Sequence, residues 1–133
     1  MKILLDTHIL LWAMADDEQL PEKARELIQN EENEIYFSII SLWEIQIKHI
    51  LHPNQMESAE TVAKYCREAE FGMIPLSKSH IGRLPELKRP DSAPRHKDPF
   101  DKILICQAIT EEMVFLTHDS LIADYGVSNV LVV

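Results

Sequence analysis

The chain has 133 residues, of which 46% are hydrophobic and 26% charged, a balance that fits one globular domain with a real core. Its formal net charge of −9 argues against a general nucleic-acid coat or a membrane-surface protein. No apolar run is long enough to span a membrane, and the opening residues do not predict a signal peptide. Cys66 and Cys106 are expected to be reduced, buried thiols in a cytoplasmic protein.

Strands and helices are expected to alternate along the whole chain. In chain order the expected elements are a strand at 2–5, helices at 7–15 and 21–30, a strand at 35–40, helices at 41–51 and 59–70, a strand at 73–76, helices at 77–84 and 99–113, a strand at 114–117, a helix at 120–125 and a strand at 130–133. The pattern predicts a single α/β domain over residues 1–133. Its short parallel sheet of four to five strands would be sandwiched between helices in a Rossmann-like, three-layer arrangement.

Four acidic residues stand where a buried strand is expected to give way to a helix. They are Asp6, Glu44, Asp101 and Asp119. In an open parallel sheet the carboxyl ends of the strands meet at one edge, where ligands bind. Carboxylates gathered there repel one another unless a cation neutralises them, and an all-oxygen ligand set suits Mg²⁺ or Mn²⁺ rather than Zn²⁺. The pattern therefore predicts a site for one or two of these ions, in an enzyme that acts on phosphate esters.

Helix capping is the structural alternative for each acid taken alone. Asp6 and Asp119 stand at positions typical of N-caps. Ser41 and Glu44 have the spacing of a capping box, and Lys48 is placed to pair with Glu44 four residues earlier. Each acid alone is therefore better explained by structure than by catalysis. Four separate caps have no reason to share one edge of a sheet, whereas four metal ligands must.

The segment Asp98-Pro99-Phe100-Asp101 predicts the start of a helix. Capping explains Asp98 well. It explains Asp101 less well, because Asp101 shares the expected core face with Ile105 and Ala108, where a carboxylate needs a partner or a metal. The register favours Asp101 as the direct metal ligand, and the sequence leaves the choice between the two acids open.

Supporting groups are predicted around these acids. Thr117 and Ser41 are expected to orient carboxylates or waters by hydrogen bonding, with Lys48 and Asp98 in similar roles. The run from Arg83 to Lys97 holds five basic and two acidic residues and leads into the acid-bearing segment. A solvated loop is the ordinary explanation of such a run. Contacts with the substrate are predicted for three residues in it: Arg95, His96 and Lys97.

Five further side chains have a plain structural explanation. His8, His96 and His118 adjoin the acids and are candidates to support them or to contact substrate, although the default for each is an ordinary surface histidine. Trp12 and Trp43 stand at helical positions and are expected in the core.

Four segments then carry a resemblance to a known family. They are Leu-Leu-Asp6-Thr-His, Ser41-Leu-Trp-Glu44-Ile, His96-Lys-Asp98-Pro-Phe-Asp101-Lys-Ile-Leu-Ile-Cys-Gln-Ala and Leu-Thr117-His-Asp119, in this order. Together they resemble the PIN-domain family, in particular the VapC-type toxins of bacterial toxin–antitoxin pairs. The resemblance covers essentially the whole chain, and the run from Asp98 to the alanine is its most specific part.

The resemblance implies a PIN-like fold and a Mg²⁺- or Mn²⁺-dependent endoribonuclease that hydrolyses RNA phosphodiester bonds as a toxin. It also implies a homodimer and a cognate antitoxin that inserts a peptide, often basic, across the acidic site. By position, the family's roles fall on an acidic quartet, an auxiliary acid and a hydroxyl residue: Asp6, Glu44, Asp101 and Asp119, then Asp98, then Thr117.

Three other interpretations stay open. A non-catalytic protein-binding module would keep the fold without activity. An aspartyl-phosphate phosphatase wants a second aspartate two residues after the first, where this chain has His8. A phosphoacceptor receiver domain wants paired acids near the N-terminus and a later lysine after a strand, which fits Glu44 and the Asp98–Asp101 pair poorly.

Overall fold

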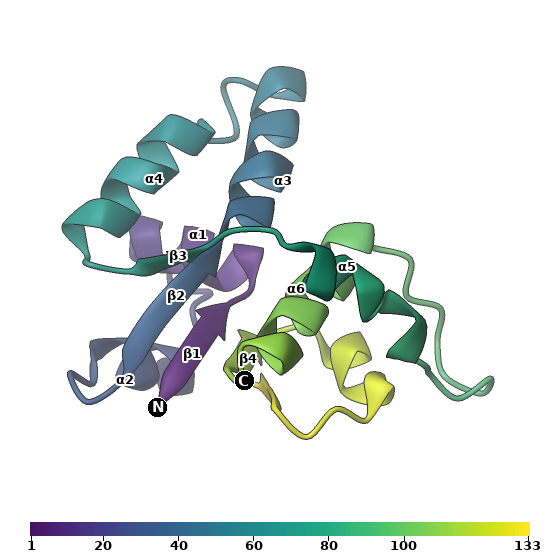
Figure 1. Ribbon diagram of the computed structural model, residues 1–133. Helices are drawn as coiled ribbons and strands as arrows, with labels where there is room; N and C mark the ends of the chain where they lie inside the picture. The colour runs from purple at the N-terminus through teal and green to yellow at the C-terminus, as the bar shows by residue number, and fades with distance from the viewer.

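The computed structural model describes all residues from 1 to 133 and alternates strands with helices (Figure 1). The strands are β1 (Lys2–Leu5), β2 (Glu34–Ser38), β3 (Gly72–Ile74), β4 (Val114–Thr117) and β5 (Val130–Val132). The α-helices are α1 (Thr7–Ala15), α2 (Glu22–Gln29), α3 (Ile39–Leu51), α4 (Ala59–Glu68), α5 (Lys78–Gly82) and α6 (Pro99–Thr110). Two 3₁₀ helices complete the fold: η1 (Leu84–Glu86) and η2 (Ser120–Tyr125).

All five strands are parallel and form one sheet in the order β3-β2-β1-β4-β5, which confirms the predicted fold class. The central strand, β1, pairs with β2 through Leu4 and Tyr36 and with β4 through Leu4 and Phe115. The chain first builds outward from β1 to β3 and then crosses back to β4 on the other side. In such sheets ligands usually bind beyond the carboxyl ends of the strands at this reversal, which are β1 and β4 here.

Alternate residues of the strands face opposite sides of the sheet and supply two cores. Ile3 and Leu5 pack in one core with residues of α1, α2, α3 and α4. Leu4 and Phe115 pack in the other, mainly with residues of α6 and η2. Figure 1 shows α3 and α4 beside the β2–β3 half of the sheet and α5 and α6 beside the β4 half. The sheet is thus buried on both faces, as the predicted three-layer arrangement requires.

The boundary between β2 and α3 differs from the prediction. The strand ends at Ser38 and the helix begins at Ile39, whereas the sequence predicted a strand to 40 and a helix from Ser41. Ser38 is the N-cap, since its hydroxyl oxygen accepts a hydrogen bond from the Ile40 amide at 3.0 Å. The predicted capping box between Ser41 and Glu44 is therefore wrong. The residues around Ser38, aromatic before it and β-branched after it, suit a buried strand and a buried helix equally well.

Two other predictions about side-chain position have different outcomes. Trp43 is 58% exposed, so its expected place in the core is wrong; it stacks edge-on against Phe100 with ring centroids 5.2 Å apart. Trp12 is half-buried and packs against the first core.

Cys66 and Cys106 are free and buried as predicted, and burial raises the pKa of the Cys66 thiol to about 12. Such a thiol is unreactive at neutral pH.

No helix in the structure combines the length and the apolar character needed to cross a membrane.

Candidate functional site

Asp6 lies at the carboxyl end of the central strand and caps α1, as predicted. Its Oδ1 accepts a hydrogen bond from the Thr7 amide at 2.7 Å, and its Oδ2 accepts one from the Thr117 hydroxyl at 2.6 Å. The Thr117 oxygen also accepts a hydrogen bond from the Asp119 amide at 3.1 Å. Burial raises the pKa of Asp6, and the bonds from Thr117 and Thr7 oppose that rise. Thr117 thus joins the acids at the ends of β1 and β4.

Glu44 lies in the second turn of α3 and is buried. Its Oε2 accepts a hydrogen bond from the Lys48 ammonium at 2.7 Å, which confirms the predicted pairing. Its Oε1 is buried and has no hydrogen-bond partner. One turn earlier, the hydroxyls of Ser41 and Thr7 lie 2.9 Å apart and join α3 to α1. A buried carboxylate oxygen without a hydrogen-bond partner is energetically costly. One of the two Glu44 oxygens therefore needs a partner that the protein does not supply.

Asp98 and Asp101 have different positions although they are three residues apart. Asp98 is the N-cap of α6, and its Oδ1 accepts hydrogen bonds from the amides of Phe100 and Asp101 at 2.9 and 3.3 Å. Asp98 is half-buried, whereas Asp101 is only 9% exposed. The predicted capping role of Asp98 is confirmed, and so is the inward register of Asp101.

The surroundings of Asp101 show that the acids gather at one place. Burial raises the pKa of this carboxyl to about 8, and the charges of nearby carboxylates add to the rise. Those carboxylates belong to Asp6, Asp98, Glu44 and Asp119. The structure therefore brings the predicted acids, carried by four different elements, to one edge of the sheet. Shared helix capping does not explain this, because neither Glu44 nor Asp101 is a cap.

His96 is buried within this site, so the expectation of a surface histidine is wrong. Its Nε2 lies 3.1 Å from Asp101 Oδ2, and its Nδ1 lies 2.7 Å from the Tyr125 hydroxyl. Burial lowers the pKa of His96, which favours the neutral ring at neutral pH. A neutral ring gives a continuous hydrogen-bonded chain in which the Tyr125 hydroxyl donates to Nδ1 and Nε2 donates to Asp101. No local sequence signal marks Tyr125, which follows 29 residues later in the chain.

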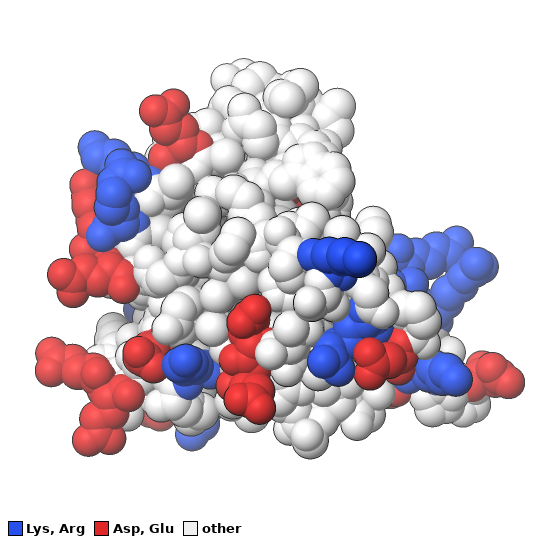
Figure 2. Space-filling view, viewed as in Figure 1, with Lys and Arg blue, Asp and Glu red and all other residues white.

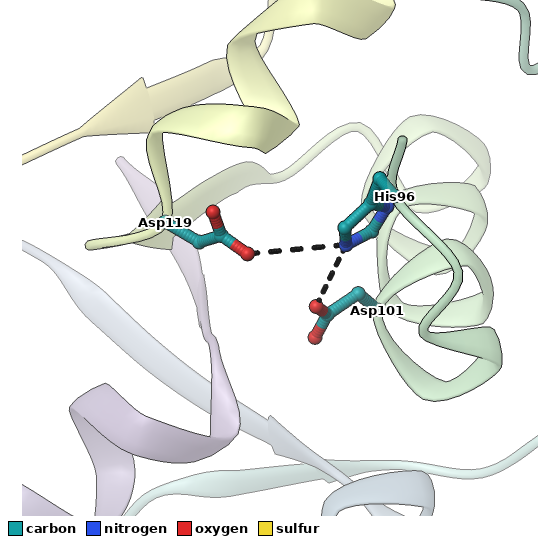
Figure 3. Close-up of side chains that lie close together, drawn as sticks. All are labelled: His96, Asp101 and Asp119. Atoms are coloured by element: carbon teal, nitrogen blue, oxygen red, sulfur yellow. Dashed lines mark hydrogen bonds and ion pairs between the residues drawn. The ribbon is translucent and has the colours of Figure 1, made fainter. Parts of the chain in front are cut away.

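Asp119 completes the site from the end of β4. Its Oδ1 accepts a hydrogen bond from the Leu121 amide at 2.9 Å and so caps η2 as predicted. Its Oδ2 lies 3.9 Å from His96 Nε2, and Figure 3 shows this nitrogen facing both the Asp119 and the Asp101 carboxylate. One ligand atom from each of these three residues lies within 4.8 Å of the other two. The Asp101 and Asp119 carboxylates would hold a divalent cation here, and His96, whose Nε2 carries the proton, would stand beside it as a hydrogen-bond donor rather than a ligand.

The donors suit Mg²⁺ or Mn²⁺, because most are carboxylate oxygens. Glu44 Oε1 is also a buried oxygen that lacks any other partner. The Lys48 ammonium, held by Glu44, supplies one positive charge against the several carboxylates of the site. A bound cation would give Glu44 Oε1 a partner. It would also reduce the repulsion between carboxylates that, together with burial, raises the pKa of Asp101.

Arg95 and Lys97 flank His96 in the chain and are exposed. They belong to the loop between η1 and α6, which has the basic composition noted above. Figure 2 shows basic side chains gathered on the side of the molecule where α5 and this loop lie, whereas acidic side chains predominate on the opposite side, over α2 and α4. Contact of Arg95, His96 and Lys97 with a substrate stays a prediction.

These features define an α/β protein whose acids gather at the carboxyl-end edge of its parallel sheet, where the order of the strands reverses. The model of the PIN domain family matches residues 3–127. The chain therefore belongs to the PIN-domain family, as its motifs indicated.

Solved structures share the fold over nearly the whole chain. VapBC2 from Rickettsia felis, solved bound to a promoter DNA fragment, has a TM-score of 0.67 at 18% identity and covers 100% of this chain and 98% of its own. FitAcB from Neisseria gonorrhoeae has a TM-score of 0.66 at 16% identity, with 97% and 96% covered. A toxin–antitoxin complex from Klebsiella pneumoniae has a TM-score of 0.64 at 18% identity, with 97% and 95% covered. No curated protein sequence matches the chain significantly.

Proposed function

We propose that this PIN-domain protein is a Mg²⁺- or Mn²⁺-dependent endoribonuclease and the toxin of a toxin–antitoxin pair. The observation that carries the proposal is the buried Asp101 carboxyl with four other carboxylates near it, those of Asp6, Glu44, Asp98 and Asp119. Natural proteins keep such a repulsive cluster where function needs it. Membership of the PIN-domain family supports the nuclease role, and the toxin–antitoxin complexes that share the fold support the biological context.

In this proposal four acids hold one or two cations at the sheet edge: Asp6, Glu44, Asp101 and Asp119. When bound, the ions supply a nucleophilic water at neutral pH and stabilise charge on the attacking and leaving oxygens of an in-line displacement at phosphorus. The expected products carry a 5′-phosphate and a 3′-hydroxyl.

The surrounding residues would hold these acids in position. The Thr117 hydroxyl fixes the rotation of the Asp6 carboxylate through the 2.6 Å bond, and Lys48 holds Glu44 through one oxygen while leaving the other for the ion. Ser41 anchors the start of α3 against α1. Asp98 acts as an auxiliary acid that caps α6 and adds negative charge beside Asp101.

The partners in this proposal are RNA, a second copy of the chain and an antitoxin, all in the cytoplasm. A basic antitoxin segment would be attracted to the cluster of acids at this edge of the sheet. Large apolar side chains on the outside of α3 suit a protein interface, since Ile50 is 69% exposed and Leu51 is 66% exposed. Membership of the PIN-domain family removes the support for a phosphatase or a receiver domain. A non-catalytic binding module would give a distinct outcome in the following test.

Purified protein, free of any antitoxin, is expected to cut RNA from a total cellular pool in Mg²⁺ or Mn²⁺. EDTA should stop the cutting, and an excess of Mg²⁺ should restore it, because the ion supplies the nucleophilic water. Sequencing of the cut ends should find 5′-phosphates. Cutting that persists in EDTA would contradict metal dependence. Absence of cutting by folded protein that binds Mn²⁺ would favour the binding module.

A further inference from the structure

A shallow pocket of about 260 Å³ opens directly beside the candidate active site. It is lined by two of the site's acids and three ring side chains: Asp6, Asp119, His8, Trp12 and His118. The three rings have no role in the proposed cleavage chemistry. They are also accessible, since His8 and His118 are exposed and Trp12 is half-buried. The pocket thus presents ring surfaces next to the carboxylates that would act on a phosphodiester.

The three rings form one continuous wall drawn from two elements. His8 and Trp12 lie one turn apart on α1, with ring centroids 5.8 Å apart and planes tilted by 38°. His118 follows β4, and its ring meets Trp12 edge-on with centroids 5.6 Å apart. The His118 Nδ1 hydrogen-bonds to the Val133 carbonyl. Because this backbone oxygen accepts, Nδ1 carries a proton in this contact. The contact with Val133 therefore orients the His118 end of the wall.

The chemistry of the pocket fits a flat, uncharged group better than a phosphate. No Lys or Arg lines it, and the two acids in its lining repel anions. Its volume lies below the range of about 300–1,000 Å³ found for drug-sized ligands, so it suits a single ring system. Aromatic side chains hold unpaired bases of single-stranded RNA by stacking, and a histidine nitrogen can accept from an exocyclic amine.

We propose that Trp12 and His118 form a base-binding subsite that stacks the unpaired nucleobase next to the scissile phosphate. This inference rests on the proposed ribonuclease function and deepens it by naming the substrate class. The preferred RNA is single-stranded or bulged at the cut, because a base inside a duplex is held in the helical stack and does not reach such a pocket.

The first test follows Trp12 by fluorescence and does not depend on cleavage. The chain has two tryptophans, so Trp43→Phe leaves Trp12 as the only reporter. In Mg²⁺, rapid mixing with a single-stranded octaribonucleotide should quench Trp12 before turnover. The same octamer as a duplex, or with abasic riboses throughout, should quench it much less. Equal quenching by the abasic octamer would overturn the proposal.

The second test compares two ring variants with a matched histidine control. Trp12→Leu keeps an apolar side chain against the core, and His118→Ala removes an exposed ring. His49→Ala is the control, because His49 is also accessible in part and also bonds a backbone carbonyl through Nδ1, that of Met56 at 2.6 Å. On a single-stranded substrate with one mapped cut site, KM should rise about 5- to 100-fold for the ring variants, with little change in kcat. The control should match wild type.

An abasic substitution beside the cut completes the test. Wild type should lose the same factor on the abasic substrate that the Trp12→Leu variant loses on the intact one, and the variant should lose nothing further. Unchanged KM in both ring variants, with active wild type, would overturn the subsite and leave the ribonuclease intact. Variants that cut RNA normally but escape the antitoxin would also overturn it, in favour of a protein side chain in the pocket. Absence of cutting by every protein would instead count against the proposed function.

Discussion

Replacing Asp101 with asparagine is expected to lower RNA cleavage by about 10³-fold while the protein stays folded. Asparagine has nearly the same shape but lacks the negative charge that attracts a cation. It also keeps an oxygen that can accept the hydrogen bond from His96, which lies 3.1 Å from the native carboxylate. The loss should therefore appear as a lower rate of RNA cleavage under single-turnover conditions. The circular dichroism spectrum of the variant should be unchanged.

Two companion variants make this result specific. Asp98→Asn keeps a good N-cap for α6, so it should retain most of the activity if Asp101 is the direct ligand. Asp16→Asn changes an exposed acid that pairs with Arg25 away from the site and should behave as wild type. A severe loss in Asp98→Asn with near-normal cleavage by Asp101→Asn would reverse the assignment of the two acids.

The second large effect concerns stability in the absence of metal. The pKa of Asp101 is raised from 3.8 to about 8 in the folded protein. Below pH 4 the folded and unfolded chains both hold this proton, so the group does not change the free energy of unfolding. Between pH 4 and pH 8 the unfolded chain releases it while the folded chain retains it, so the free energy of unfolding falls as pH rises. Each pH unit in that window lowers it by up to about 1.4 kcal/mol.

Urea unfolding in EDTA at pH 5 and pH 8 measures this effect. Wild type should lose about 2–4 kcal/mol more between these pH values than Asp101→Asn, which has no such proton. The difference between the two proteins removes the contribution of His96, whose lowered pKa acts in the opposite sense at acidic pH. Mg²⁺ at pH 8 should restore stability to wild type and do little for the variant. If the free energy of unfolding changed with pH in the same way in both proteins, the pKa of Asp101 would not be raised by folding.

These two predictions have one physical origin. The fold keeps the carboxylates of Asp6, Glu44, Asp101 and Asp119 together although their repulsion destabilises the metal-free protein. The surrounding structure supports that arrangement with fixed contacts, such as the Thr117 hydroxyl on Asp6. A local arrangement that lowers the stability of the folded protein is typical of functional sites.

Much of the fold was predictable because its signals are local. The alternation of apolar strands with helices required a parallel sheet, and Asp98-Pro99 marked the start of α6 correctly. The collection of acids at one edge followed from the geometry of parallel sheets rather than from any single motif. The inward register of Asp101 followed from its spacing to Ile105 and Ala108, which are both fully buried.

The features that sequence did not reveal depend on contacts between distant segments. His96 is buried, and the partner of its Nδ1 is Tyr125, far along the chain. Ser38, not Ser41, caps α3, and no periodicity separates a buried strand from a buried helix in that apolar run. The ring wall of Trp12 and His118 exists only because α1 and the end of β4 lie side by side. Periodicity along one segment does not report such pairings.

Direct titration of Mn²⁺, followed by the loss of its free-ion electron paramagnetic resonance signal, tests most directly whether these carboxylates form a metal centre. It needs no RNA, so a narrow substrate preference does not obscure the result. Wild type should bind one or two Mn²⁺ per chain in competition with Mg²⁺, Asp16→Asn should bind equally, and Asp101→Asn should bind at least about 10-fold more weakly. Equal binding by wild type and Asp101→Asn, or no binding by wild type, would contradict a metal-dependent active site at this edge of the sheet.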